Sequence, residues 1–266
     1  MRPHETEQVS EHPFKQTMEP PEEAASQMVD TLSLPNRWLR IDQALQASGG
    51  ASEAVWTYFD ARTPELVARP VTVGGRAAAW FVRVGTFEAV LRQYRRGGLV
   101  AKLVQDRYVW SGLSQTRAFL EFDLLRSMWR AGLPVPRPLG AAVWRQGLTY
   151  RAALLTQRIP DAQPLANSTD PELWARAGAT IAAMHRFGVW HADLNVFNIL
   201  SDVQGKIWLI DFDRGRPGVL TPGKRADNLS RLLRSLKNTA RDFPQTCWQA
   251  LLKGYQQVWC AQEQLK

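Results

Sequence analysis

The sequence predicts an α+β fold of two lobes, with a β-rich N-terminal half followed by a helical C-terminal half. Three observations lead to this prediction. Short apolar runs separated by glycine turns prevail up to about residue 157. Beyond it, apolar residues recur at helical spacing. A cluster of Asp and Asn residues between positions 193 and 213 marks a polar site in the second half. This order of elements is the layout of a two-lobed nucleotide-binding enzyme.

The composition is that of an ordinary globular protein. Of 266 residues, 45% are hydrophobic and 22% are charged. No uncharged apolar run approaches the ~20 residues that a membrane helix needs. Met1 to Asp30 lack the apolar core of a secretory signal, so we expect a cytosolic protein. Cys247 and Cys260 would lie about 20 Å apart on one helix, too far for a disulfide, and both are expected to be buried thiols.

Charge is unevenly placed along the chain. Residues 1–30 hold seven acidic and two basic residues, a net charge of −5, whereas the whole chain carries +8. The remaining residues therefore carry +13. A basic body suits an anionic partner, whether phosphates, nucleic acid or an acidic membrane surface, and could equally be a solubilising excess. Residues 1–33, rich in Glu, Gln and Pro without periodicity, are predicted to be a disordered acidic tail.

Residues 34–157 are expected to form the N-terminal lobe. Runs of apolar residues on either side of Gly85 and Gly147 predict two hairpins, and the stripe from Phe119 to Met128 predicts a helix that Gly132 ends. The predicted elements are, in order, a short helix (37–46), a strand (54–59), a hairpin (80–84 and 88–94), a helix (115–131) and a second hairpin (141–144 and 150–156).

Residues 158–266 are expected to form the C-terminal lobe, which begins with a polar linker. Asp170-Pro171 opens an amphipathic helix that Gly188 closes. The predicted elements are the linker (161–167), that helix (170–187), a strand (207–210) and helical stretches whose apolar stripes run over 229–236 and 248–259.

The residues with the clearest chemistry form a His191-x-Asp193 sequence with Asn198 five positions after the aspartate. Asp211 follows at the end of an apolar strand. Phosphoryl transfer needs a carboxylate to accept the proton of the attacking hydroxyl, and oxygen ligands to hold Mg²⁺ against the phosphates. We therefore predict Asp193 as the catalytic base and Asn198 and Asp211 as metal ligands. The alternative is that these are ordinary turn residues, since Asp and Asn favour turns.

These motifs resemble the protein-kinase-like superfamily. The longer sequences around these motifs are similar to the Kdo kinase family of lipopolysaccharide core kinases. These sequences are HADLNVFNIL and WLIDFDRGR, and also VLRQYRRGGLVAKL, TRAFLEFDLL and GLPVPRPLGA. The resemblance covers about residues 71–238. It implies a two-lobed protein-kinase-like fold and ATP-dependent, magnesium-assisted phosphorylation of a Kdo hydroxyl, the 4-hydroxyl, on a Kdo-lipid A precursor. The place implied is the cytoplasmic face of the inner membrane, as a peripheral protein.

The resemblance also implies roles in the N-terminal half. Gly74, Gly75 and Arg76 would cover the nucleotide phosphates, although an ordinary hairpin loop is an equal alternative. Arg92 stands where protein kinases place a phosphate-binding lysine, and Glu121 in the following helix is its natural ion-pair partner. The alternatives are that Arg92 is an ordinary exposed arginine on a strand and that Glu121 is an ordinary solvated glutamate on a helix.

Departures from protein kinases indicate a small anionic acceptor. Ala192 stands where an arginine usually reads a phosphorylated loop, and Asp213 replaces the usual glycine. Only about fifteen residues separate Asp213 from the next helix, so the activation segment is short. Arg214 and Arg216 suit a sugar carboxylate or a lipid phosphate, or are a solvated turn. His191 is expected to orient the loop, and His185 to be a cap or core residue.

Two basic clusters, around residues 92–107 and 224–241, favour an anionic inner-membrane surface as partner and no nucleic acid. RNA binding and ordinary solvated faces are the alternatives for them. Two other functions stay open at this point. One is a kinase of another acceptor, such as a core heptose, an antibiotic or a protein serine. The other is a catalytically dead kinase-like binding module, which Arg92 in place of lysine would favour.

Overall fold

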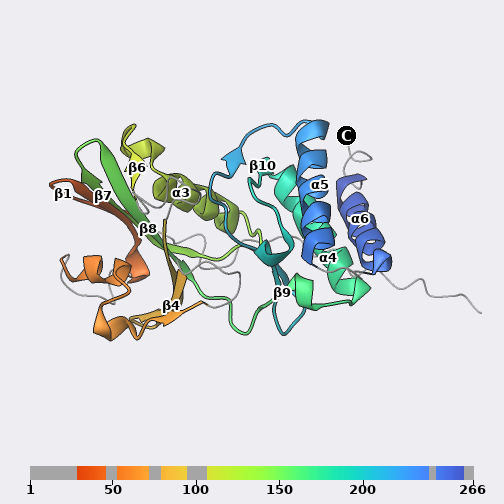
Figure 1. The fold of residues 1–266 in the computed structure, drawn as a ribbon, viewed down its shortest axis with the longest axis horizontal. Coiled ribbons are helices and arrows are strands. Elements are labelled where there is room, and N and C mark those ends of the chain that lie inside the picture. The colour runs from red at the N-terminus through yellow and green to blue at the C-terminus, as the bar shows by residue number, and fades with distance from the viewer. Residues whose placement is uncertain (1–28, 46–52, 72–78, 95–106, 240–243, 261–266) are drawn as a thin grey trace, which may run out of the picture.

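The computed structural model of the chain describes residues 29–45, 53–71, 79–94, 107–239 and 244–260. A half built on one antiparallel sheet lies beside a half built of helices (Figure 1). The α+β fold class predicted from the sequence is confirmed.

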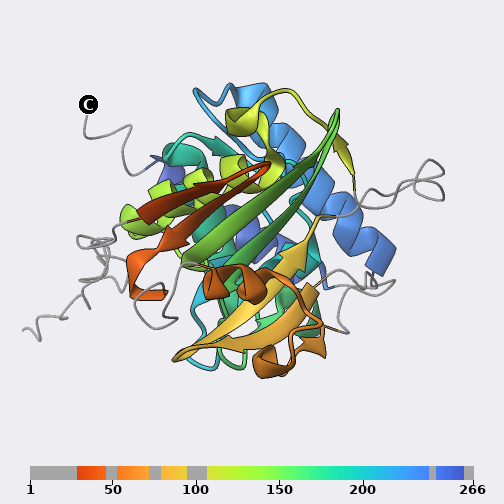
Figure 2. The same cartoon turned by 90° about the vertical axis from the view of Figure 1, so that its left-hand side faces the viewer.

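The sheet follows the order β1-β2-β7-β8-β5-β4-β3, and β6 pairs with β8 (Figure 2). Gly85 and Gly147 take the left-handed conformation in the turns of the hairpins β4–β5 and β7–β8, so both predicted hairpins are confirmed. The strands are β1 (Val29–Leu34), β2 (Arg37–Asp42), β3 (Arg69–Pro70), β4 (Ala79–Val84), β5 (Phe87–Gln93), β6 (Tyr108–Val109), β7 (Pro138–Gln146) and β8 (Thr149–Gln157).

Predictions for the first 60 residues need correction. The helix predicted at 37–46 is largely the strand β2, because the buried Leu39 and Ile41 alternate along it and face one side of the sheet. The strand predicted at 54–59 is instead the 3₁₀ helix η1 (Ala54–Phe59), which buries Val55, Trp56 and Phe59. Residues 29–33, assigned to the acidic tail, belong to β1, which forms the edge of the sheet and pairs antiparallel with β2. Residues 1–28 lie outside the described residues.

The two faces of the sheet are covered differently. Side chains from η1 and η2 (Pro64–Leu66) pack on one face with Leu91 and Leu155. The helix α3 (Arg117–Arg130) covers the other face with Phe119, Phe122 and Leu125. The cluster on the α3 face continues into the C-terminal helices, so one core connects the sheet to the elements that hold the polar site.

The helical half contains α4 (Pro171–Arg186), α5 (Pro222–Thr239) and α6 (Gln245–Cys260). The backbones of α4 and α6 touch, because a Cβ on Gly178 would come within 1.9 Å of the Leu251 carbonyl oxygen and one on Gly254 within 2.0 Å of that of Ala175. The predicted linker 161–167 contains β9 (Gln163–Pro164) and η5 (Leu165–Asn167), since Leu165 is fully buried. The remaining short elements are η4 (Leu113–Gln115), β10 (Val189–Trp190), η6 (Val196–Asn198), β11 (Ile199–Ser201), β12 (Ile207–Leu209) and β13 (Arg216–Pro217).

The cysteines do share α6, as expected. Cys247 is buried, but Cys260 is exposed, which corrects the prediction of two buried thiols. Among the described residues, no helix is both long and apolar enough to cross a bilayer.

Candidate active site

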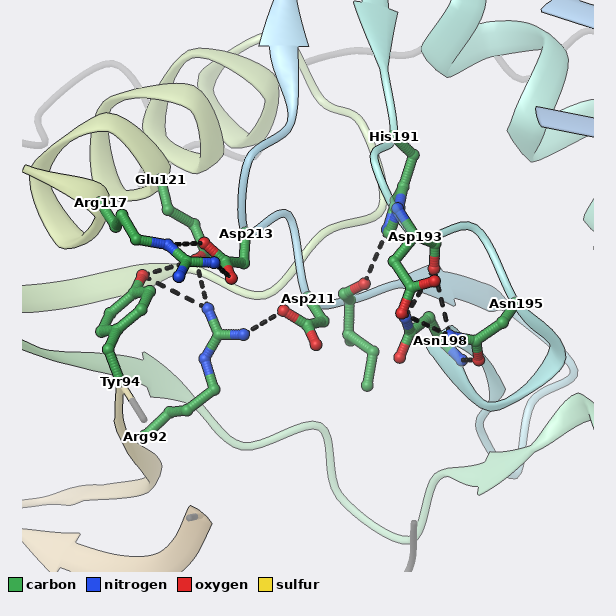
Figure 3. A network of polar contacts seen from close by, with 11 residues as sticks. Arg92, Tyr94, Arg117, Glu121, His191, Asp193, Asn195, Asn198, Asp211 and Asp213 are labelled. Carbon is green, nitrogen blue, oxygen red and sulfur yellow. Dashed lines mark hydrogen bonds and ion pairs between the residues drawn. The ribbon is translucent and has the colours of Figure 1, made fainter. Parts of the chain in front are cut away.

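The loop of residues 191–198 is held by its own side chains. The Asn195 carboxamide oxygen accepts from the backbone N–H of Phe197 at 2.9 Å and of Asn198 at 3.2 Å, and so caps η6. The Asn195 Nδ2 donates to Asp193 Oδ2 at 3.2 Å, and Asn198 Nδ2 donates to the Asp193 carbonyl oxygen at 2.9 Å. Both bonds hold Asp193 in place (Figure 3). The Asp193 side chain is nevertheless 53% exposed. The loop thus holds Asp193 firmly while leaving about half of its carboxylate side chain exposed.

His191 orients this loop, as the sequence predicts. Its Nδ1 accepts from the Asp193 backbone N–H at 3.1 Å, so the proton lies on Nε2, which donates to the Ile210 carbonyl oxygen at 3.0 Å. The ring packs on Phe212 with centroids 4.7 Å apart. Burial lowers the pKa of His191, which keeps the ring neutral and preserves this tautomer.

A buried relay connects the loop to the helices behind it. Asn228 of α5 donates from Nδ2 to the His191 carbonyl oxygen at 2.7 Å, and its Oδ1 accepts from the His191 N–H at 3.2 Å. The same Oδ1 lies 3.0 Å from Nε2 of His185 in α4, whose Nδ1 lies 2.9 Å from the Tyr255 hydroxyl of α6. Burial lowers the pKa of His185 to about 4, so the ring is neutral: Nε2 donates and Nδ1 accepts. His185 is a core residue, one of the two roles that the sequence predicts for it.

Asp211 lies beside this loop because β12 pairs with β11. The Ile210 N–H donates to the Asn198 carbonyl oxygen at 3.0 Å, which brings the ends of the two segments together. Asp211 has φ +61°, a left-handed conformation that Asp tolerates better than most residues. Burial acts to raise the pKa of Asp211, but the nearby Arg92 guanidinium outweighs it and holds the pKa below its usual value.

Arg92 connects the sheet, α3 and the aspartate. Its guanidinium forms ion pairs with Glu121 of α3 and with Asp211, and lies 3.3 Å from the Tyr94 hydroxyl (Figure 3). The Tyr94 hydroxyl donates to Glu121 at 2.5 Å. The ion pair expected between Arg92 and Glu121 is therefore present. Glu121 is only 2% exposed, and burial raises its pKa to about 7 against the opposing charge of Arg92.

A second ion pair was not anticipated from the sequence. Arg117, at the start of α3, binds the Asp213 carboxylate with two guanidinium nitrogens, and its Nε lies 2.8 Å from Oδ1. The Arg117 guanidinium lies 4.8 Å from the Tyr108 ring centroid. Two features of the sequence mark these residues one at a time: Asp213 stands in place of the usual glycine, and Arg117 lies four residues before Glu121 on the same helix face.

The remaining predicted positions, Gly74, Gly75 and Arg76, lie outside the described residues. Arg214 and Arg216 are both exposed, and Arg216 is the first residue of β13.

The oxygen atoms around Asp211 fit a divalent cation. Asn198 donates from its amide nitrogen to the Asp193 carbonyl oxygen, which leaves its Oδ1 available as a ligand, and the bond from the Ile210 N–H to the Asn198 carbonyl oxygen brings Asp211 to the same loop. Among the described residues, no group of three or more His, Cys, Asp and Glu side chains could hold a metal. A small oxygen donor set matches Mg²⁺, which binds proteins through one or two carboxylates and completes its shell with waters and phosphate oxygens.

Comparison with known proteins gives concordant matches. The model of the lipopolysaccharide kinase (Kdo/WaaP) family matches residues 65–255. A protein named 3-deoxy-D-manno-octulosonic acid kinase from Xanthomonas campestris pv. campestris (strain B100) is 45% identical over 200 residues, which cover 72% of this chain and 80% of that protein. Proteins with the same name from Xylella fastidiosa are 45% identical over 206 residues (strain M23; 72% and 80% covered) and 50% identical over 174 residues (strain M12; 64% and 70% covered).

Among solved structures, the bifunctional kinase-methyltransferase WbdD matches with a TM-score of 0.44 and 17% identity. The match covers 71% of this chain and 45% of that chain.

Proposed function

The chain belongs to the lipopolysaccharide kinase (Kdo/WaaP) family and is an ATP-dependent phosphotransferase with a sugar acceptor, and on that premise we propose that it phosphorylates the 4-hydroxyl of Kdo on a Kdo-lipid A precursor. The reaction serves assembly of the lipopolysaccharide core. The observation that carries the proposal is that a hydrogen-bonded loop holds Asp193 and Asn198, and that the bond from the Ile210 N–H to the Asn198 carbonyl oxygen brings Asp211, the next residue, to that loop. These are the three groups that phosphoryl transfer needs.

In this proposal Asp193 is the catalytic base. Its half-exposed carboxylate accepts the proton of the acceptor hydroxyl as that oxygen attacks the γ-phosphorus of ATP, the bond from this phosphorus to the β,γ-bridging oxygen breaks, and ADP leaves. Asn198 and Asp211 hold Mg²⁺, which when bound neutralises charge on the phosphate oxygens. His191 keeps the Asp193 backbone in place and takes no proton from the substrate.

Arg92 and Glu121 form the phosphate-binding part of the site. Arg92 is kept cationic and oriented by the buried Glu121, so its guanidinium can contact phosphate oxygens once Asp211 is engaged elsewhere. We assign Gly74, Gly75 and Arg76 to the same phosphates, as the sequence predicts. Residues 34–157 would thus bind the nucleotide, and residues 158–266 would supply the catalytic groups.

A lipid-linked acceptor also implies a place for the reaction. We propose peripheral attachment to the anionic cytoplasmic face of the inner membrane. The excess of Lys and Arg outside the first 30 residues supports this, because basic segments gain about 1 kcal/mol per residue near such a surface.

The test is transfer of labelled γ-phosphate from Mg-ATP to a Kdo-lipid A precursor by the wild type and by Asp193→Ala. We expect transfer by the wild type and loss of it in the variant, with the phosphate located on the 4-hydroxyl by NMR. No transfer by wild-type protein that binds Mg-ATP would refute the Kdo assignment. Heptose-bearing, antibiotic and protein acceptors would then be tried in its place, and failure with all of them would indicate a binding module.

A further inference from the structure

An arginine from the helical half lies beside Asp193, the proposed base. Arg231 of α5 has its guanidinium nitrogen 3.5 Å from Asp193 Oδ1, and 45% of its side chain is exposed. The position follows from how α5 lies along the loop. Asn228, one turn earlier, binds His191, and Ser235, one turn later, accepts from the Val196 N–H at 3.3 Å. Residues 228, 231 and 235 share one face of the helix.

Stability does not explain this pair. Both side chains are about half exposed and the contact is longer than a good charged hydrogen bond, so the pair contributes about 0–1 kcal/mol at most. The guanidinium and the carboxylate approach each other to 3.5 Å, beyond the roughly 2.7–2.9 Å of a charge-assisted hydrogen bond. Arginine carries five N–H donors in a planar fork that matches a carboxylate. Most of the binding capacity of Arg231 is therefore available to a ligand at Asp193.

The acceptor needs such a cation. The sugar in the proposed reaction is an octulosonic acid, so it carries a carboxylate along with the hydroxyl that is phosphorylated. To react, it must approach the Asp193 carboxylate and the phosphates of ATP, all of which repel it. Resting on the proposed function, we infer that Arg231 binds the carboxylate of the acceptor sugar and thereby places the reacting hydroxyl at Asp193.

The inference is tested with three acceptors and three proteins. The acceptors are the Kdo-lipid A precursor, the same glycolipid with the Kdo carboxylate converted to a neutral methyl ester, and a form without the lipid A phosphates. The proteins are the wild type, Arg231→Gln and the control Lys237→Gln. Lys237 is exposed on the same helix, and six residues of helical rotation point it away from the loop. Both substitutions remove one positive charge.

We expect the wild type to use the carboxylate acceptor about 10- to 100-fold better than the ester, measured as kcat/KM, because a charged hydrogen bond is lost with the ester. Arg231→Gln should use both acceptors equally, with an unchanged KM for ATP. Lys237→Gln should discriminate as the wild type does.

Other results would overturn the inference. If Arg231→Gln discriminates against the ester as strongly as the wild type, Arg231 does not bind the carboxylate. If the variant instead loses its discrimination against the dephosphorylated acceptor, the anion that Arg231 recognises is a lipid phosphate. If the wild type phosphorylates none of the three acceptors, the proposed function fails and the inference fails with it, a result distinct from the other two.

Discussion

Replacing Glu121 with glutamine should raise the free energy of unfolding at pH 8 and lower kcat at the same pH. Glu121 is buried against Arg92 and Tyr94, and its pKa rises from an ordinary value of 4.5 to about 7. That rise corresponds to about 3 kcal/mol between its two protonation states. The folded protein holds this proton more tightly than the unfolded chain, so the free energy of unfolding falls as the pH rises from about 4.5 to about 7 and is level above it.

Glutamine cannot ionise but keeps an oxygen that accepts from Tyr94 or Arg92. We therefore expect Glu121→Gln to match the wild type in stability near pH 5 and to exceed it by about 2–3 kcal/mol at pH 8. The kcat at pH 8 should nevertheless fall about 10- to 100-fold, because Arg92 loses the anionic partner that orients it. Urea denaturation at several pH values and phosphate-transfer kinetics measure the two effects.

The control is Glu88→Gln, which removes an exposed glutamate from β5, the strand that carries Arg92. This variant should change the free energy of unfolding by less than about 1 kcal/mol at every pH. Parallel stability curves for the wild type and Glu121→Gln would refute the reasoning, since Glu121 would then not titrate near neutrality. A loss of about 3–5 kcal/mol at pH 8 would refute it too, because the ion pair would then outweigh the burial of the carboxylate.

Three further predictions follow from the structure. Asp193→Asn should lower kcat about 10²- to 10⁴-fold while the free energy of unfolding stays within about 0.5 kcal/mol, because Asp193 is half exposed; kinetics and urea denaturation of the same preparation check this. Gly178→Ala should lower the free energy of unfolding, measured by urea denaturation, by about 3 kcal/mol or more, because its Cβ would meet a backbone oxygen. Gly223→Ala, whose Cβ would lie 3.9 Å from the nearest atom, should leave this free energy unchanged or raise it. A double-mutant cycle of Arg117→Gln and Asp213→Asn should give a coupling energy of about 1–3 kcal/mol, and additive effects would mean that the pair contributes nothing.

The parts of the molecule that sequence predicted well are those set by local pattern. The hairpins follow from apolar runs around glycines, and α3 and α4 follow from apolar stripes with clear ends. The grouping of Asp193, Asn198 and Asp211 was accessible because one short loop and one short hairpin connect them. Their roles in catalysis and metal binding stay predictions.

What sequence missed depends on packing between distant segments. Arg117 and Asp213 are 96 residues apart, and the sequence features that mark each of them do not identify the other as its partner. Arg231 was grouped only with a basic cluster, because its distance from Asp193 depends on how α5 lies along the loop. The strand β2 was mistaken for a helix because a ten-residue stretch with five apolar residues fits both periods until its partners β1 and β7 are known.

The buried relay through His185 has a consequence for synthesis of the enzyme. The loop that carries Asp193 leaves the ribosome well before α6, yet Tyr255 and Gly254 of α6 complete the packing behind it. Before α6 docks, the hydroxyl that orients the His185 ring is absent, while Asn228 and His191 can still form their own two hydrogen bonds. The nascent chain therefore holds Asp193, Asn198 and Asp211 before the packing behind their loop is complete, and a helix far along the sequence supplies the last part of that support.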